Sequence, residues 1–371
     1  MKEARKILLV ELCANGDCLY ATAIARQIKH DFPDCHLTWA IAGFCKSIIF
    51  NNPYVDALME VNDAPKNDLA AFRKFKRGIL SQKKKGLWDE VFITQVIDDN
   101  AANYDGCIRS ATFRGYKNKI TVPVTPVLRL TNKEKENVKE FAEMNGLHKY
   151  KHVILFEFSP LSGQAKITRE DALNIAEDLV NKTDSVIILS SGDKITHPNR
   201  RIIDGSHLSI RETAELTHYC TFLLGCSSGI TWVSTSDAAK RLPMVQLLSP
   251  DPIFINSVAR DFERQGLSEY EIIEITNVET KNIVETVLLA FSDFKKAKNK
   301  FNTEIPVSFK TTRYIVCNLL IHFQFKAILR HIRINKEVYG HKFSFYKECI
   351  MGFLILPFIV TKFLFIKMTK N

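Results

Sequence analysis

Residues 6–17 read KILLVELCANGD, an apolar run followed by a short loop of small and polar residues. The run 6–12 has the length and composition of a strand buried on both faces, as in a parallel sheet. From about residue 18 to 31 the apolar positions recur with helical spacing. This strand–loop–helix unit is the opening of an α/β fold.

The same alternation of strands and helices continues through most of the chain, which predicts a doubly wound α/β architecture. Helices are expected over 131–145, where Thr131 and Glu134 have capping-box spacing, and over 168–181, 209–219 and 228–240. Further strands are expected at 36–42, 56–61, 89–94, 119–122, 152–158, 185–190, 221–225 and 244–248.

A break at Pro123–Pro126 divides the pattern into two Rossmann-like units. We therefore predict domains at 1–126 and 127–294, followed by a basic, aromatic-rich helical tail at 295–371. Open parallel sheets bind ligands beyond the carboxyl ends of their strands. Two such units in series predict a cleft between them, with the ligands inside it.

Composition excludes several classes of protein. The chain has 371 residues, of which 46% are apolar and 25% charged, which is typical of globular protein and excludes wholesale disorder. Its nine cysteines are scattered and form neither a CxxC pair nor a zinc-like cluster, which favours a reducing compartment. Glu11 interrupts the first apolar run, so we expect a strand there rather than an export signal.

The basic excess is concentrated in the tail. Residues 295–371 hold 15 Lys and Arg against 3 Asp and Glu, whereas the whole chain has a net charge of +10. Such asymmetry indicates an anionic partner, either a membrane surface or nucleic acid. No recognised nucleic-acid motif is present, so we expect no nucleic-acid partner.

Residues 350–366 (IMGFLILPFIVTKFLFI) strengthen the membrane interpretation. Lys362 and Pro357 favour a segment that lies in the bilayer interface over one that crosses it. The alternative is an apolar helix packed on the body of the protein. We expect a cytoplasmic protein held peripherally on the inner face of the cytoplasmic membrane by this tail.

The first candidate for chemistry is Asn15-Gly16-Asp17, between the first strand and helix. Asp17 is placed where a carboxylate could act as a general base beside the cleft. Aspartate is also favoured at helix N-termini for capping alone, and the spacing does not decide between the two roles. The chain has neither a GxGxxG fingerprint after the first strand nor a Walker loop.

Three further loops follow strands of the second unit. Residues 225–229 (GCSSG) place small residues and hydroxyls before a helix, as a phosphate or diphosphate site requires, although an ordinary capped loop has the same composition. Residues 159–166 (SPLSGQAK) offer hydroxyls and Lys166, which is either a phosphate-binding cation or a surface lysine. Ser-Gly-Asp at 191–193 is a weaker signal for a ribose.

Taken in order, these motifs resemble the lipopolysaccharide heptosyltransferase group, glycosyltransferase family 9, over roughly residues 5–290. The resemblance begins with the strand, the small-x-Gly-Asp loop and the helix of the first 61 residues. It rests further on Phe32-Pro33-Asp34, Asn52-Pro53-Tyr54-Val55-Asp56, the Ser159–Lys166 loop, Ser209–Leu216, the Gly225–Gly229 loop and Leu248-Ser249-Pro250-Asp251-Pro252.

The resemblance implies a GT-B fold, with the acceptor on the first domain and a nucleotide-sugar donor on the second. It implies inverting transfer without a metal or other cofactor, to a lipopolysaccharide or other lipid-linked surface glycan. Asp17 matches the family's proposed base and Lys166 the lysine that contacts the donor phosphates. Asn15 and Gly16 fall on the acceptor side; the donor-binding set is Ser159, Ser162, Lys166, Ser227, Ser228 and Gly229.

Two residues depart from the family pattern. Ser227 stands where the family's donor loop usually has an Asp, and Trp232 where it has a His. Trp232 could stack on a sugar or a base, or it could fill core. These losses motivate an alternative function, a non-catalytic nucleotide-sugar-binding or scaffolding relative.

Overall fold

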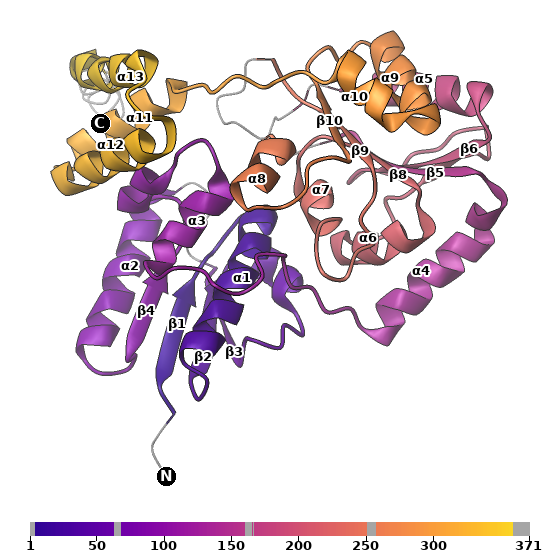
Figure 1. The fold of residues 1–371 in the computed structure, drawn as a ribbon. Coiled ribbons are helices and arrows are strands. Elements are labelled where there is room, and N and C mark those ends of the chain that lie inside the picture. Colours follow the sequence, from indigo (N-terminus) through magenta and orange to yellow (C-terminus); the bar gives the residue numbers. More distant parts are fainter. Residues whose placement is uncertain (1–3, 63–67, 160–164, 166, 251–256, 359–371) are drawn as a thin grey trace, which may run out of the picture.

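The computed structural model describes residues 4–62, 68–159, 165, 167–250 and 257–358 (Figure 1). Two separate parallel sheets form its two domains, and helices cover their faces. The first sheet has the strand order β3-β2-β1-β4 and the second the order β10-β9-β8-β5-β6-β7. This is the doubly wound architecture that the sequence predicts.

The first domain has β1 at the centre of its sheet. β1 pairs in parallel with β2 on one side and with β4 on the other, and three of its side chains, Ile7 to Leu9, are fully buried. Its elements are β1 (Lys6–Val10), α1 (Asn15–Asp31), β2 (His36–Ile41), η1 (Gly43–Ile49), β3 (Ala57–Glu60), α2 (Leu69–Lys84), β4 (Glu90–Ile93), η2 (Asp98–Asn103) and α3 (Ile108–Tyr116).

The second domain is built around β5, which is paired with β6 and β8. The predicted capping box is present, since Glu134 N donates to Thr131 Oγ1 and Thr131 N donates to Glu134 Oε2. The elements are α4 (Asn132–Met144), η3 (Leu147–Lys149), β5 (His152–Glu157), α5 (Arg169–Lys182), β6 (Ser185–Ser190), β7 (Ile202–Asp204), α6 (Ile210–Leu216), η4 (Thr217–Tyr219), β8 (Phe222–Gly225), α7 (Gly229–Val233), β9 (Met244–Leu247), α8 (Val258–Arg264), β10 (Ile272–Ile275), α9 (Thr280–Ser292) and α10 (Phe294–Phe301).

Two predicted elements are wrong. The segment 119–122 is not a strand, because the backbone N–H groups of Thr121 and Val122 donate to the side-chain oxygen of Gln27 instead of to a neighbouring strand. The helix predicted over 228–240 ends at Val233. Hydroxyl side chains follow that residue, and Thr235 Oγ1 bonds back to a backbone carbonyl, which favours turns over continued helix.

Residues 295–301, which the sequence analysis places in the tail, belong with the second domain. They form α10, which packs on α9 and β10. Ala297 is fully buried there, and Phe294 and Phe301 pack against the same core cluster. The apolar side chains at 294, 297 and 301 lie on one helix face, which explains why this highly basic segment packs on the second domain.

The remaining described part of the tail forms a three-helix module that packs on the first domain (Figure 1). Its helices are α11 (Lys310–Ile321), α12 (Phe325–Tyr339) and α13 (Phe343–Leu354). Their buried side chains share one core with Ala102, Tyr104 and Ala111 of η2 and α3. This part of the basic tail is therefore a packed helical module, of which only the end of α13 (350–354) belongs to the predicted interfacial segment.

Residues 359–366 of the predicted interfacial segment lie outside the described part of the chain. Within the described part of that segment, Gly352 is buried, whereas Ile350, Phe353 and Leu354 are exposed. None of the helices in the described ranges is long and apolar enough to cross a bilayer.

His331 fixes this module to the first domain. Its ring is fully buried, 3.1 Å from the Ala102 carbonyl oxygen and 3.3 Å from Thr312 Oγ1. Burial lowers the pKa of His331 to about 4, against the opposing influence of the Ala102 carbonyl and Asp105. A histidine with a depressed pKa stabilises the fold above its unfolded pKa and loses that contribution as the pH falls toward its folded pKa.

We predict that His331→Gln reduces the acid sensitivity of the protein. The wild-type free energy of unfolding should fall between pH 6.5 and pH 4 by on the order of 3 kcal/mol more than that of the variant, since glutamine does not titrate. Urea denaturation at several pH values measures this, with His341→Gln on the same module as the control. If the free energy of unfolding depends on pH in the same way for the wild type and His331→Gln, the lowered pKa of His331 is contradicted.

Candidate functional site

A cavity of about 1000 Å³ lies between the two domains. This volume is at the upper end of the range for small-molecule sites. Its walls are the loops beyond the carboxyl ends of β1, β5, β6 and β8, together with α8 and one side of α11. The loops after parallel strands thus converge from both domains, as the fold predicts.

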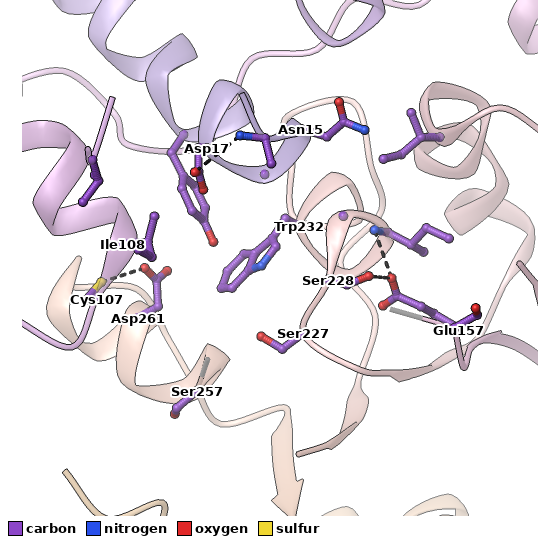
Figure 2. A pocket seen from close by; sticks show the side chains of 18 of the residues that line it. Asn15, Asp17, Cys107, Ile108, Glu157, Ser227, Ser228, Trp232, Ser257 and Asp261 are labelled. Carbon is purple, nitrogen blue, oxygen red and sulfur yellow. Dashed lines mark hydrogen bonds between the residues drawn. The ribbon is translucent and has the colours of Figure 1, made fainter. Parts of the chain in front are cut away.

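On the first-domain side, Gln95 fixes the loop that carries Asp17. Gln95 Oε1 accepts hydrogen bonds from Leu12 N and Cys13 N at 2.8 and 3.0 Å, and its Nε2 donates to the Cys13 carbonyl. Asp17 accepts a long hydrogen bond of 3.5 Å from Ala14 N and lines the cavity (Figure 2). Asp17 therefore takes part in capping while its carboxylate also faces the cavity.

A second carboxyl group, Glu11, lies in the core beneath this loop. It is fully buried, and Thr94 Oγ1 donates to it at 2.7 Å. Burial raises the pKa of Glu11 well above its usual value, and the charge of Asp17 raises it further. Both effects favour the protonated form of Glu11.

On the second-domain side, Glu157 at the end of β5 holds the 226–231 loop. Glu157 accepts hydrogen bonds from the Ser228 hydroxyl, from Ile230 N at 3.2 Å and from Thr231 Oγ1 at 2.8 Å (Figure 2). The protein's own carboxylate thus occupies the N-terminus of α7, where the sequence favoured a phosphate. Ser228 orders the loop through this bond.

Ser227 adopts a backbone conformation that is uncommon for a residue with a side chain. Its φ is +53°, and its N–H donates to Gln246 Oε1 at 2.7 Å. Left-handed residues other than glycine cluster at functional sites, where the surrounding structure enforces them. The Gln246 and Glu157 contacts supply that enforcement beside the cavity.

Trp232 connects the two halves of the site. It is 8% exposed, it packs edge-to-face on Tyr20 with ring centroids 5.1 Å apart, and it also lines the cavity. A Cβ atom added to Gly16 would lie 3.5 Å from the indole, so the acceptor-side loop approaches it closely. Of the two roles that the sequence leaves open, the structure shows core packing, at a position that also borders the cavity.

A buried ion pair joins the domains beneath these rings. Arg109 of α3 is fully buried, and its Nη2 lies 2.9 Å from Asp261 Oδ2 of α8. The guanidinium also lies over the rings of Tyr20 and Trp232, at 4.6 and 5.5 Å from their centroids. Cys107 Sγ donates to the other oxygen of Asp261 at 3.1 Å (Figure 2). Burial raises the pKa of Asp261, and Arg109 opposes that effect.

The cavity brings together most of the residues predicted from the sequence. Ser162 and Lys166 lie outside the described residues. Those that line the cavity are Asn15, Gly16, Asp17, Ser159, Ser191, Gly192, Asp193, Ser227, Ser228 and Gly229.

Sequence reasoning missed several lining residues. Glu157 carries a recognisable signal, an acid at the end of the apolar strand HVILFE, whereas Ser257 and Arg260 of the α8 region carry none. Arg260 is the one cation among the lining residues that the structure describes. Among all the residues that the structure describes, no group of three or more His, Cys, Asp or Glu side chains is arranged to hold a metal ion.

No family model and no curated protein matches this chain. Its structure is similar to that of the glycosyl transferase family 9 protein from Veillonella parvula DSM 2008, at 14% identity and a TM-score of 0.53, covering 81% of this chain and 95% of that one. It is also similar to E. coli ADP-heptose lps heptosyltransferase II, at 14% identity and a TM-score of 0.51, covering 78% and 99%. The predicted GT-B fold is confirmed.

We predict that Arg109→Met destabilises the protein by about 3–5 kcal/mol, because it leaves Asp261 buried without its cation. The double variant Arg109→Met/Asp261→Leu should recover most of that loss, since neither charge remains. Urea denaturation measures both. The control is Arg241→Met, which removes a partly exposed guanidinium that stacks on Phe262. Equal small losses for Arg109→Met and Arg241→Met would contradict the role of the pair.

Proposed function

We propose that this protein is an inverting glycosyltransferase that moves a sugar from a nucleotide-sugar donor to a glycan acceptor without a resident metal. The observation that carries the proposal is the pairing across one cavity of Asp17 from the first domain with the Ser227–Gly229 loop from the second. The fold shared with the two solved transferases supports it.

The donor fits the second-domain side of the cavity. Ser159, Ser191, Ser227 and Ser257 line this side, and Arg260 supplies a positive charge. A cation and oriented hydroxyls can stabilise a departing diphosphate in a site that excludes water. The family resemblance adds Lys166 and Ser162 to the same role.

In the proposed reaction, the Asp17 carboxylate takes the proton of an acceptor hydroxyl. The resulting oxygen attacks the anomeric carbon of the donor, and the bond from that carbon to the diphosphate oxygen breaks as the new glycosidic bond forms. Attack from the face opposite the leaving group inverts the anomeric centre. The electron pair leaves with the diphosphate, whose added charge is stabilised by Arg260 and the neighbouring hydroxyls.

We propose that this transfer runs without a metal because cationic side chains of the chain take the metal's role at the diphosphate. Asp98 and Asp99 are two neighbouring acids of the kind that can bind a metal, but Arg73 and Lys76 lie within salt-bridge distance of them. Transfer should therefore persist in excess chelator.

We predict that Asp17→Asn lowers the transfer rate by about 10²–10⁴-fold, because the amide cannot accept the proton. Release of nucleoside diphosphate from a panel of nucleotide sugars measures transfer, with a lipid extract of the producing cells as acceptor. Asp178→Asn, at a partly exposed position on α5 outside the cavity, is the matched control. If Asp17→Asn keeps wild-type turnover, Asp17 is not the base; if the wild type turns over no sugar, the non-catalytic alternative is favoured.

We further propose that the acceptor is carried by a membrane lipid and that the three-helix module holds the protein on an anionic bilayer at the cytoplasmic face. One outward face of α13 supports this. It presents Phe343, Lys347, Ile350 and Leu354, all exposed and at helical spacing. An apolar stripe interleaved with lysine matches the boundary between lipid headgroups and acyl chains. The same positive charge disfavours pairing of two copies through this face.

We predict that the protein sediments with vesicles of phosphatidylglycerol and not with vesicles of phosphatidylcholine alone, and that added salt weakens the binding. Replacing Phe343, Ile350 and Leu354 together with serine should release most of the protein from the vesicles. Met144→Ser removes an equally exposed apolar side chain on α4 and should leave binding unchanged. Absence of wild-type sedimentation at low salt would overturn the membrane proposal.

A further inference from the structure

One side of α11 belongs to the wall of the inter-domain cavity. The lining residues from this helix are Thr311, Tyr314, Ile315 and Asn318, which follow one another at helical spacing and therefore lie on a single face. Thr311 and Ile315 are buried, whereas Tyr314 is 55% exposed. The three-helix module thus contributes directly to the site.

The first domain continues this wall with apolar side chains. Val96, Ala101, Tyr104 and Ile108 line the cavity and pack in the same core cluster as α11. Figure 2 shows Ile108 on the Asp17 side of Trp232, while Glu157 lies on the other side of the indole. This apolar wall is therefore on the side of the proposed base, away from the proposed donor loops.

Contacts with α13, and of α12 with η2, hold α11 in place on the side away from the cavity. Arg313 of α11 forms an ion pair with Glu348 of α13, and a Cβ atom on Gly352 would lie only 2.8 Å from the Arg313 carbonyl oxygen. His331 fixes α12 against η2 on the other side. Close packing of this kind keeps the α11 face in place without a ligand, which lowers the entropic cost of binding.

From this arrangement we propose that α11 and the η2–α3 segment form an acceptor subsite that binds an apolar or aromatic group next to the accepting hydroxyl. The apolar surface takes the body of that group, and the Asn318 amide and Tyr314 hydroxyl are available to polar atoms at its edge. The cavity volume of about 1000 Å³ leaves space for this group beside a donor. The inference rests on the proposed transferase function and specifies the acceptor side of that site.

The test compares n-octyl β-D-glucopyranoside, below its critical micelle concentration, with methyl β-D-glucopyranoside. Both are titrated into the full chain without donor, and binding is followed by ligand-observed NMR. The wild type should bind the octyl glycoside at least tenfold more tightly. Tyr314→Ala should weaken octyl glycoside binding about five- to tenfold, and Asn318→Trp, which fills the subsite, should abolish it. Neither variant should alter the binding of the methyl glycoside.

Two controls locate the binding. Tyr270→Ala removes a more exposed tyrosine outside the cavity, and the triple serine variant of Phe343, Ile350 and Leu354 removes the outer face of α13. Both should bind the octyl glycoside as the wild type does. Loss of binding only in the triple variant, or equal affinity of the wild type for the two glycosides, would overturn the subsite.

This binding test is independent of catalysis. The glycosides are titrated without donor, so the readout needs no sugar transfer. If the protein binds the octyl glycoside through Tyr314 but never turns over a nucleotide sugar, the subsite is supported and the proposed function is contradicted. If the protein transfers sugars equally well to both glycosides, and Tyr314→Ala has no effect, the proposed function is supported and the subsite is contradicted.

Discussion

The site depends on the buried ion pair between Arg109 and Asp261, because its two charges come from different domains. Either charge alone in this buried position would cost several kcal/mol, so each charge needs the other when the domains meet. The guanidinium also packs against Tyr20 and Trp232. Together with the Arg264–Asp105 ion pair between the same two helices' ends, this contact holds the Asp17 loop opposite the Ser227 loop across the cavity.

Each domain then orders its own loop by a side chain from its own sheet. Gln95, just beyond β4, clamps the turn before α1, and Glu157, at the end of β5, binds the hydroxyls and N–H groups before and within α7. Both devices use a buried polar group whose partners are backbone or hydroxyl atoms of the functional loop. They leave Asp17 and the cavity-facing hydroxyls in position before a ligand arrives, as electrostatic catalysis requires.

Much of this could be predicted from the sequence. Apolar runs such as 6–12 and 185–190 are buried parallel strands, and the loops after them do reach one cavity, because strand direction alone fixes where those loops lie. Long-range partners could not be predicted. Arg109, Glu157 and Arg260 have no local pattern that reveals their partners, and the docking of α11 depends on apolar faces that meet only in the folded chain. The basic charge of the tail indicated a surface role. It gave no sign that one face of α11 would line the site.

The central claim is that this cavity binds a nucleotide sugar on its second-domain side. Thermal denaturation of the purified protein in the presence of ADP, UDP, GDP, CMP and dTDP sugars tests it most directly, since a ligand that binds only the native state stabilises it by about 2.7 kcal/mol at a hundredfold excess over Kd. We predict that one nucleotide class raises Tm selectively, that the shift is lost in Arg260→Ala and that it persists in Asp17→Asn. A Tm unchanged by every nucleotide sugar, or a shift that survives in Arg260→Ala and disappears in Asp17→Asn, would contradict the account.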